Sequence, residues 1–390
     1  MKHPFKAPLF EKTVIGLILT AGVCLMAAAQ TAPTWMRTPA ISPDGRTIVF
    51  AYKGDLYRVP ASGGAAVALT VNEAHDFMPV WSHDGRTIAF ASDRYGSFDV
   101  FVMPAEGGPA RRLTSHSAAE LPFAFTPDDS AVLFGAARLG AAASRIFPTA
   151  SQPELYRVPV TGGRVVQVLT TPAENVQPSR DGRTLLYQDK KGGENEWRKH
   201  HVSAIARDIW ILDTKTGKHA KITSFPGEDR NPVFAPGEKD FYYLSEESGS
   251  FNVHRMSVAG GPSRQITRFK THPVRFLTMA ADGTLCFGYD GEIYTMKEGG
   301  EPRPVAVTIA VDSRSNNEIV VPISGGAREF AVSSNGKEIA VVARNGVFAA
   351  GVDGGATKQV TASSGQERGV EFSPDGQAIL YASERDGRWG

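Results

Sequence analysis

Residues 42–70 read SPDGRTIVFAYKGDLYRVPASGGAAVALT and contain four parts in a fixed order. A polar turn at 42–45 is followed by the apolar run 48–50, and a second run at 55–59 begins with Asp55. The pair Gly63-Gly64 comes next, and a last short run ends in Leu69-Thr70. Runs rich in Val, Ile, Phe and Tyr between Gly, Pro and Asp are typical of strands joined by tight turns. Asp-Gly and Gly-Gly pairs supply the positive φ angles that such turns need, so the stretch predicts one four-stranded antiparallel sheet.

The same order of parts recurs along the chain, without long amphipathic helical periodicity after residue 30. The turn phrase occurs eight times at intervals of 40 to 56 residues, at Asp44, Asp84, Asp128, Asp181, Gly237, Asp282, Asn335 and Asp375. This interval is the length of one β-propeller blade. Because a single four-stranded blade cannot bury both of its faces, blades pack around a shared axis. We therefore expect an all-β protein built from propeller blades.

The spacing of the turn phrases also predicts the domains. Six phrases lie between residues 40 and 290 and two lie after residue 330, whereas 305–318 has none and becomes polar at its end. We predict a six-bladed β-propeller at 35–310, a linker at 311–325, and the first two blades of a second, truncated propeller at 326–390. A single eight-bladed ring is the alternative. The sequence stops in mid-blade at Gly390, which would leave an open sheet edge, so we expect a fragment of a longer protein.

The first thirty residues have the pattern of an export signal. Three lysines precede the apolar stretch 14–26, and Ala27-Ala28-Ala29 supplies the small residues of a cleavage site. The stretch is short for a membrane span, so we predict a signal peptide at 1–29, cleaved near Ala29, and a periplasmic or extracellular protein. An uncleaved anchor is the alternative. Cleavage would remove Cys24 and leave Cys286, which we expect to be buried in its apolar run.

Composition and motifs argue against several functions. Lys and Arg number 42 against 41 Asp and Glu, without a sustained basic stripe, so we do not expect nucleic-acid binding. The nucleophile motif Gly-x-Ser-x-Gly does not occur in the sequence. The repeated aspartates are explained as turn residues. We predict no catalytic, cofactor or metal site within this chain, although a propeller axis can assemble a site from distant residues.

Two blades carry insertions, at 136–153 and 189–207, and such insertions form loops on the faces of the ring, where ligands and partner domains bind. The insertion residues predicted to face a partner or substrate are Arg138, Arg145, Glu194, Glu196, Trp197, Arg198, His200 and His201. The two histidines and two glutamates could be read as metal ligands. Adjacent histidines cannot both face one ion on a regular element, so we favour a solvated loop that docks on a neighbouring domain. We expect Trp197 and Trp210 to pack against their blade.

Three segments resemble the amino-terminal part of tricorn proteases, including the exported tricorn-like peptidases of bacteria. They are WMRTPAISPDG at 35–45, ASDRYG at 91–96 and GENEWRKHH at 193–201. The resemblance covers essentially the whole mature chain. The turn phrases alone are shared with Tol-system propellers and prolyl-oligopeptidase-like enzymes, so the two insertions are the more specific part of it.

The resemblance implies a six-bladed propeller, a seven-bladed propeller, a PDZ domain and a serine peptidase core, in that order. The propellers of that family are thought to gate peptide admission and product release. Its catalytic Ser, His and Glu lie downstream of both rings, so none maps onto residues 1–390. The implied partners are peptides and the downstream PDZ and peptidase domains, and a homo-oligomer is compatible with this. The archaeal members are cytoplasmic, so their giant assembly is not carried over to a chain with a signal. The alternatives are a Tol-type binding propeller and the propeller of a prolyl-oligopeptidase-like enzyme or an amidohydrolase.

Overall fold

The computed structural model describes residues 33–138, 152–193, 197–198, 200–310, 322, 325–355, 357–361, 365–385 and 387–390. The predicted signal peptide, Arg145, Glu194, Glu196 and most of the predicted linker lie outside these residues. Every regular element in the described residues is a β-strand. These residues therefore contain no helix long and apolar enough to cross a membrane. The all-β expectation is therefore confirmed. The chain divides into two compact units, residues 1–311 and 312–390.

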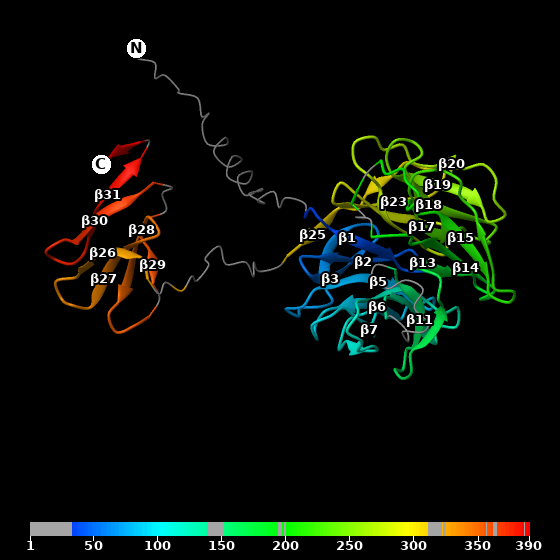
Figure 1. The fold of residues 1–390 in the computed structure, drawn as a ribbon, viewed down its shortest axis with the longest axis horizontal. Coiled ribbons are helices and arrows are strands. Elements are labelled where there is room, and N and C mark those ends of the chain that lie inside the picture. Colours follow the sequence, from blue (N-terminus) through cyan, green and yellow to red (C-terminus); the bar gives the residue numbers. More distant parts are fainter. Residues whose placement is uncertain are drawn as a thin grey trace, which may run out of the picture. The chain divides into compact units, whose positions relative to one another are not determined.

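The first unit contains six antiparallel sheets, each formed by consecutive strands (Figure 1). The first sheet contains β1 (Arg37–Ile41), β2 (Thr47–Tyr52), β3 (Asp55–Pro60) and β4 (Gly64–Ala68). The second contains β5 (Asp76–Trp81), β6 (Thr87–Ser92), β7 (Asp99–Pro104) and β8 (Arg111–Arg112). The third contains β9 (Glu120–Phe125), β10 (Ala131–Ala136), β11 (Glu154–Pro159) and β12 (Val166–Leu169).

The remaining three sheets of this unit repeat the arrangement. The fourth contains β13 (Ala173–Pro178), β14 (Thr184–Asp189), β15 (Ile209–Asp213) and β16 (Lys218–Lys221). The fifth contains β17 (Asp229–Phe234), β18 (Asp240–Ser245), β19 (Asn252–Ser257) and β20 (Arg264–Gln265). The sixth contains β21 (Arg275–Met279), β22 (Leu285–Tyr289), β23 (Glu292–Met296) and β24 (Arg303–Pro304).

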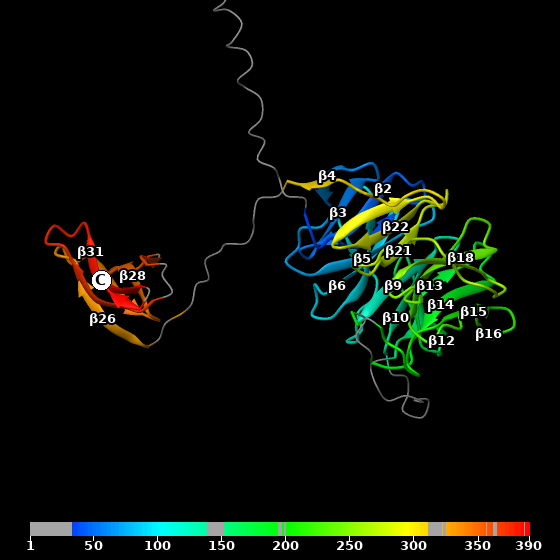
Figure 2. The same ribbon diagram turned by 90° about the horizontal axis from the view of Figure 1, so that it is seen from above.

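The six sheets form a closed ring. The first strands of successive sheets contact one another in chain order, and β21 contacts β1 to complete the circle. Strand β25 (Val307–Ile309) then joins the first sheet by pairing in parallel with β4 (Figure 2). The end of the unit is thus hydrogen-bonded to its beginning, and the first sheet acquires a fifth strand.

Apolar side chains fill the spaces between neighbouring sheets. Because each sheet is covered on both faces, its second strand is an almost continuous buried run, as in β2, where Ile48, Val49 and Phe50 are fully buried. Cys286 lies in the cluster between the sixth and first sheets with Phe50 and Ile293. Its burial is as predicted, and burial raises the pKa of its thiol to about 12. The thiol is therefore protonated and shielded at neutral pH.

The ring has two faces that the strand directions define. Consecutive strands are antiparallel, so each first strand starts where the second ends and the third begins. The insertions between β10 and β11 and between β14 and β15 begin and end on this side. We call it the insertion face. The polar turns after each first strand lie on the opposite face.

The second unit contains two sheets. One contains β26 (Ala327–Val332), β27 (Glu338–Ala343), β28 (Gly346–Gly351) and β29 (Lys358–Gln359), and the other contains β30 (Glu367–Phe372), β31 (Ile379–Arg385) and β32 (Arg388–Trp389). The two sheets share a small cluster that includes Ala340, Val342 and Val370. Phe330 and Leu380 are each 71% exposed, so apolar side chains of both sheets remain uncovered within this unit.

Candidate functional site: the central channel

The first strand of each sheet carries an irregularity at its centre. The hydrogen-bond register between first and second strands shifts in all six sheets, which marks a β-bulge. In five sheets the bulge includes the residue four positions before the polar turn, namely Thr38, Met78, Asn175, Asn231 and Phe276. In the third sheet this position is Pro122, which pairs with Phe134 beside the bulge. We call these six residues the bulge ring.

Five members of the bulge ring have a left-handed backbone, which is uncommon for residues other than glycine. Their φ angles are 46° at Thr38, 52° at Met78, 49° at Asn175, 48° at Asn231 and 59° at Phe276. Such conformations persist only where the surrounding structure enforces them, and they cluster at functional sites. The repetition of this geometry around the axis makes the centre of the ring the candidate functional site.

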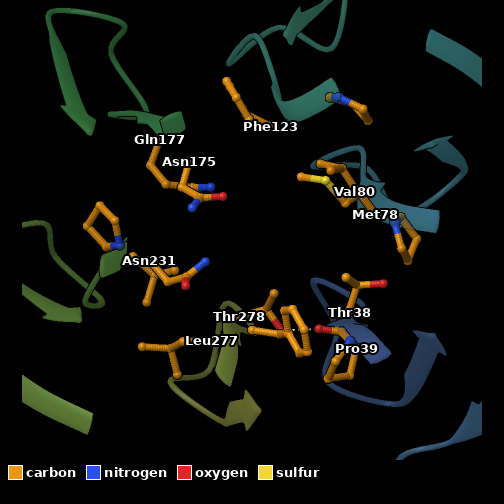
Figure 3. A pocket seen from close by; sticks show the side chains of 15 residues that line it. Thr38, Pro39, Met78, Val80, Phe123, Asn175, Gln177, Asn231, Leu277 and Thr278 are labelled. Carbon is orange, nitrogen blue, oxygen red and sulfur yellow. Dashed lines mark hydrogen bonds between the residues drawn. The ribbon is translucent and has the colours of Figure 1, made fainter. Parts of the chain in front are cut away.

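The bulge ring lines a central channel (Figure 3). Its cavity volume is about 100 Å³. The lining comes from all six first strands, and none of its described side chains is charged. Amide groups are concentrated on the β13 and β17 side, whereas Met78, Val80 and Phe123 line the side formed by β5 and β9 (Figure 3).

One buried glutamine links the two amide-bearing strands. Gln188 of β14 is 3% exposed, and its Oε1 accepts hydrogen bonds from Asn175 Nδ2 at 3.0 Å and from the Asn231 backbone N–H at 2.9 Å. Its Nε2 donates to Glu174 Oε2 at 3.0 Å. Glu174 is in turn paired with Lys190 at 3.1 Å. The amide side of the channel is thus held by a chain of hydrogen bonds that ends in an ion pair.

Further ion pairs between buried carboxylates and arginine side chains lie on the insertion face. Arg94 Nη2 lies 2.7 Å from Asp76 Oδ2, and Arg138 Nη2 lies 2.5 Å from Glu120 Oε1, with both carboxylates fully buried. Each arginine follows a second strand, and each acid begins a first strand. The pairs therefore hold the loops of the insertion face against the inner strands. Arg138 is engaged in this way, with its side chain 20% exposed.

The insertion of the fourth sheet is anchored at both ends. On the outgoing side, Lys191 Nζ lies 2.6 Å from Asp208 Oδ2. On the returning side, His201 is 5% exposed, and its Nδ1 lies 3.1 Å from Glu228 Oε1. Burial alone would raise the pKa of Glu228, but Arg230 and His201 lower it below its ordinary value. The expectation of a solvated position is therefore wrong for His201, because the neighbouring sheet supplies a buried carboxylate for it.

Trp197 reaches across the ring from this insertion. Its ring lies 5.1 Å from the Arg37 guanidinium carbon and 4.6 Å from that of Arg275, and it meets Phe276 edge-on at 6.2 Å. These residues belong to the first and sixth sheets. The prediction that Trp197 packs against its own blade is therefore wrong, since cation–π and aromatic contacts hold it to the opposite side of the channel mouth. Trp210 does pack in its own sheet, where its Nε1 donates to Asp189 at 2.8 Å.

Two more of the predicted insertion residues, Arg198 and His200, lie among the residues that the structure describes. Arg198 and His200 are exposed, and the His200 backbone N–H donates to Glu246 Oε1 at 3.1 Å. No group of three or more potential metal ligands occurs in the described residues. His201 bonds to Glu228 and, through Nε2, to Ser203 at 2.7 Å. The structure thus brings Trp197 to the channel and places His201 in an anchor beside it.

The bulge ring itself was missed by sequence reasoning. Its members do not have one residue type in common, so no motif draws attention to them individually. The signal was positional: each lies four residues before a turn phrase, and Thr38, Met78 and Asn231 each precede a proline. Residues before proline usually adopt extended conformations, so the left-handed backbone is imposed by the bulge rather than favoured by the local sequence.

A closed ring of antiparallel sheets around a central channel defines a β-propeller. The family model of the tricorn protease N-terminal β-propeller domain matches residues 33–301, and the chain belongs to this family. The predicted family resemblance is confirmed.

Comparison with two tricorn-type proteins shows what fraction of their length this chain covers. Tricorn protease homolog 1 of Streptomyces coelicolor is 25% identical over 368 residues, which cover 91% of this chain and 33% of that protein. The crystal structure of the tricorn protease aligns with a TM-score of 0.62 at 20% identity, over 90% of this chain and 33% of that one. A crystal structure of puromycin hydrolase aligns with a TM-score of 0.49 at 14% identity, over 91% of this chain and 59% of that one. The chain thus spans about a third of the length of the tricorn-type proteins that it matches.

Proposed function

We propose that this chain is the non-catalytic propeller region of an exported tricorn-like serine peptidase. In this proposal, the central channel of the first unit conducts peptides or products to or from a peptidase core in the remainder of the protein. The observation that carries the proposal is the uncharged channel on the ring axis, with Trp197 of the insertion held at its mouth. Membership of the tricorn propeller family supports the peptidase context.

The lining of the channel fits an unfolded ligand. The lining comes from a single ring of six inner strands, and an extended peptide is the form in which a peptidase receives its substrate. Among its described residues, the uncharged lining contains no side chain that would form an ion pair with a charged group of the peptide. Conduction requires such weak binding, because a ligand held tightly inside the ring would block it.

The proposal is tested by comparing two forms of the protein. The reading frame is extended past Gly390, and the longer product and residues 30–390 are assayed on fluorogenic peptides. We expect cleavage by the longer product alone. A longer product that folds but cleaves no peptide would contradict the proposal and favour a binding propeller. Export is tested separately, because we expect the amino terminus of the mature protein to begin close to residue 30.

A further inference from the structure

Two side-chain amides in the channel wall take no part in the hydrogen bonds among the described residues. Gln177 and Asn231 line the cavity, and their amide groups point into it (Figure 3). Within the described residues, neither side chain has a hydrogen-bond partner. Each carboxamide offers two donors and an acceptor oxygen. The channel wall therefore carries unfilled hydrogen-bonding capacity at two positions on neighbouring sheets.

The third amide is held in place beside them. Asn175 Nδ2 is fixed by Gln188 at 3.0 Å, which leaves its carbonyl oxygen and its second N–H available. Gln188 is itself held by Glu174, and Glu174 by Lys190. The same Gln188 oxygen accepts the Asn231 backbone N–H, so it sets the separation of β13 and β17 at this level. A site arranged before its ligand arrives loses less entropy on binding.

The chemistry of this surface complements a peptide main chain. Every non-proline residue of an extended peptide presents one N–H donor and one C=O acceptor, which amide side chains can bind together. Side chains of an extended chain alternate between two directions. Met78, Val80 and Phe123 on the β5 and β9 side offer apolar contacts to them. A charged side chain would find no counterion among the described lining residues.

We propose that Asn175, Gln177 and Asn231 form an amide arc that binds the main chain of an extended, uncharged peptide segment inside the channel. Gln188 contacts two members of this arc, the Asn175 side chain and the Asn231 backbone. The inference rests on the proposed function, because it assumes that peptides enter the ring. It goes further by naming the groups that bind them and the part of the peptide that is bound.

The test uses residues 30–390 and a defined probe. The probe is a fluorescein-labelled hexapeptide of alternating Ala and Val, acetylated, amidated and carrying one photoreactive leucine. A second probe replaces one central amide with an ester, which removes a single N–H donor. Binding is measured by fluorescence anisotropy for the native chain, Gln177→Met, Asn231→Asp and the surface control Gln377→Met, and circular dichroism checks that each variant is folded.

We expect Gln177→Met to weaken binding of the amide probe about three- to tenfold, the usual effect of one hydrogen bond. The ester probe should bind the native chain more weakly than the amide probe, and Gln177→Met should reduce that difference. Photocrosslinks should fall on strands β5, β9, β13 or β17. Asn231→Asp retains a residue type that tolerates the left-handed backbone, and its added charge should also weaken binding.

Two results would overturn the amide arc. The amide arc is wrong if the probe binds but Gln177→Met and Asn231→Asp bind it as tightly as Gln377→Met. It is also wrong if the crosslinks fall outside the channel. In both cases the chain still binds the peptide. If neither probe binds the native chain at all, the arc is wrong and peptide conduction loses its support as well. The two failures are therefore distinguishable.

Discussion

At the residue scale, two short polar motifs explain why the repeat is so regular. In the turn after β1, Ser42 Oγ donates to Asp44 Oδ1 at 2.5 Å and accepts the Thr47 backbone N–H at 3.0 Å. At the end of the sheet, Thr70 Oγ1 accepts the backbone N–H of Leu56 at 2.9 Å. The threonine bond recurs in other sheets, at Thr114, Thr223, Thr267 and Thr361. Each satisfies a buried N–H that no strand pairs.

The threonine bond predicts a measurable loss of stability. Thr114→Val keeps the shape of the side chain but leaves the buried Val100 N–H without its acceptor at 2.9 Å. We expect the free energy of unfolding to fall by about 1–3 kcal/mol in urea titrations. Thr170→Val is the matched control, because Thr170 directly follows the fourth strand of the third sheet but is exposed. Equal effects of the two substitutions would contradict this role.

A buried carboxyl predicts a pH dependence. Asp229 is fully buried at the start of β17, and burial raises its pKa to about 7, with the carboxylates of Asp208 and Glu247 acting in the same direction. Its pKa in the unfolded chain is about 3.9. Because the folded pKa is the higher one, this group contributes stability at low pH that is lost as the pH rises towards and through 7.

The consequence is tested with Asp229→Asn, which resembles the protonated form. From pH 5 to pH 8, the Tm of the native chain should fall relative to that of this variant. Asp128→Asn is the control, because a hydrogen bond from Thr126 lowers the pKa of Asp128 to about 2, outside this window. A Tm difference between the native chain and Asp229→Asn that stays constant with pH would show that Asp229 does not titrate there.

At the scale of elements, the pairing of β25 with β4 joins the end of the ring to its first sheet. One glycine allows the two backbones to come this close. Gly63 has a φ of 89°, and a Cβ atom there would lie 2.7 Å from the Ala306 carbonyl oxygen. The next residue, Gly64, donates its N–H to that same oxygen at 2.8 Å. The close approach of two backbones at this point therefore requires the absence of a side chain.

Gly63→Ala is therefore predicted to weaken closure of the ring. Gly162→Ala is the matched control, since Gly162 occupies the same turn position in the third sheet with a φ of 85° but meets no backbone atom within 4 Å. Both substitutions should cost about 1–2 kcal/mol for the left-handed backbone. Gly63→Ala should cost more, measured as the free energy of unfolding. A smaller effect at Gly63 than at Gly162 would contradict the proposed closure.

Sequence could predict the elements much better than the site. Turn phrases and Gly pairs depend on local backbone geometry, so they are readable at Asp44 or Gly63 without knowledge of the rest of the chain. The bulge ring depends on residues from six sheets that meet only after folding. Trp197 illustrates the same limit, because its partners Arg37 and Arg275 lie about 160 residues before it and 78 residues after it. His201 was likewise misread, since its carboxylate partner belongs to the next sheet.

At the scale of the whole molecule, the first unit has its own closure and a channel, whereas the second has two sheets with exposed apolar side chains such as Phe330 and Leu380. The first unit should therefore be the more cooperative of the two, because every sheet in it is covered on both faces. Its channel is the feature by which we propose that it serves a peptidase. That claim can be tested by obstructing the channel alone.

The most direct measurement uses Gln177→Cys in the longer product that extends past Gly390, without its signal peptide. Cys286 is buried and its thiol pKa is raised to about 12, so it should not react with a polyethylene-glycol maleimide. Thiols that the extension itself contributes are replaced in both the variant and its control. Our account predicts that modification of Gln177→Cys sharply reduces turnover of fluorogenic peptides, whereas modification of Gln377→Cys does not. Undiminished turnover after complete modification at residue 177 would show that peptides do not pass through this ring.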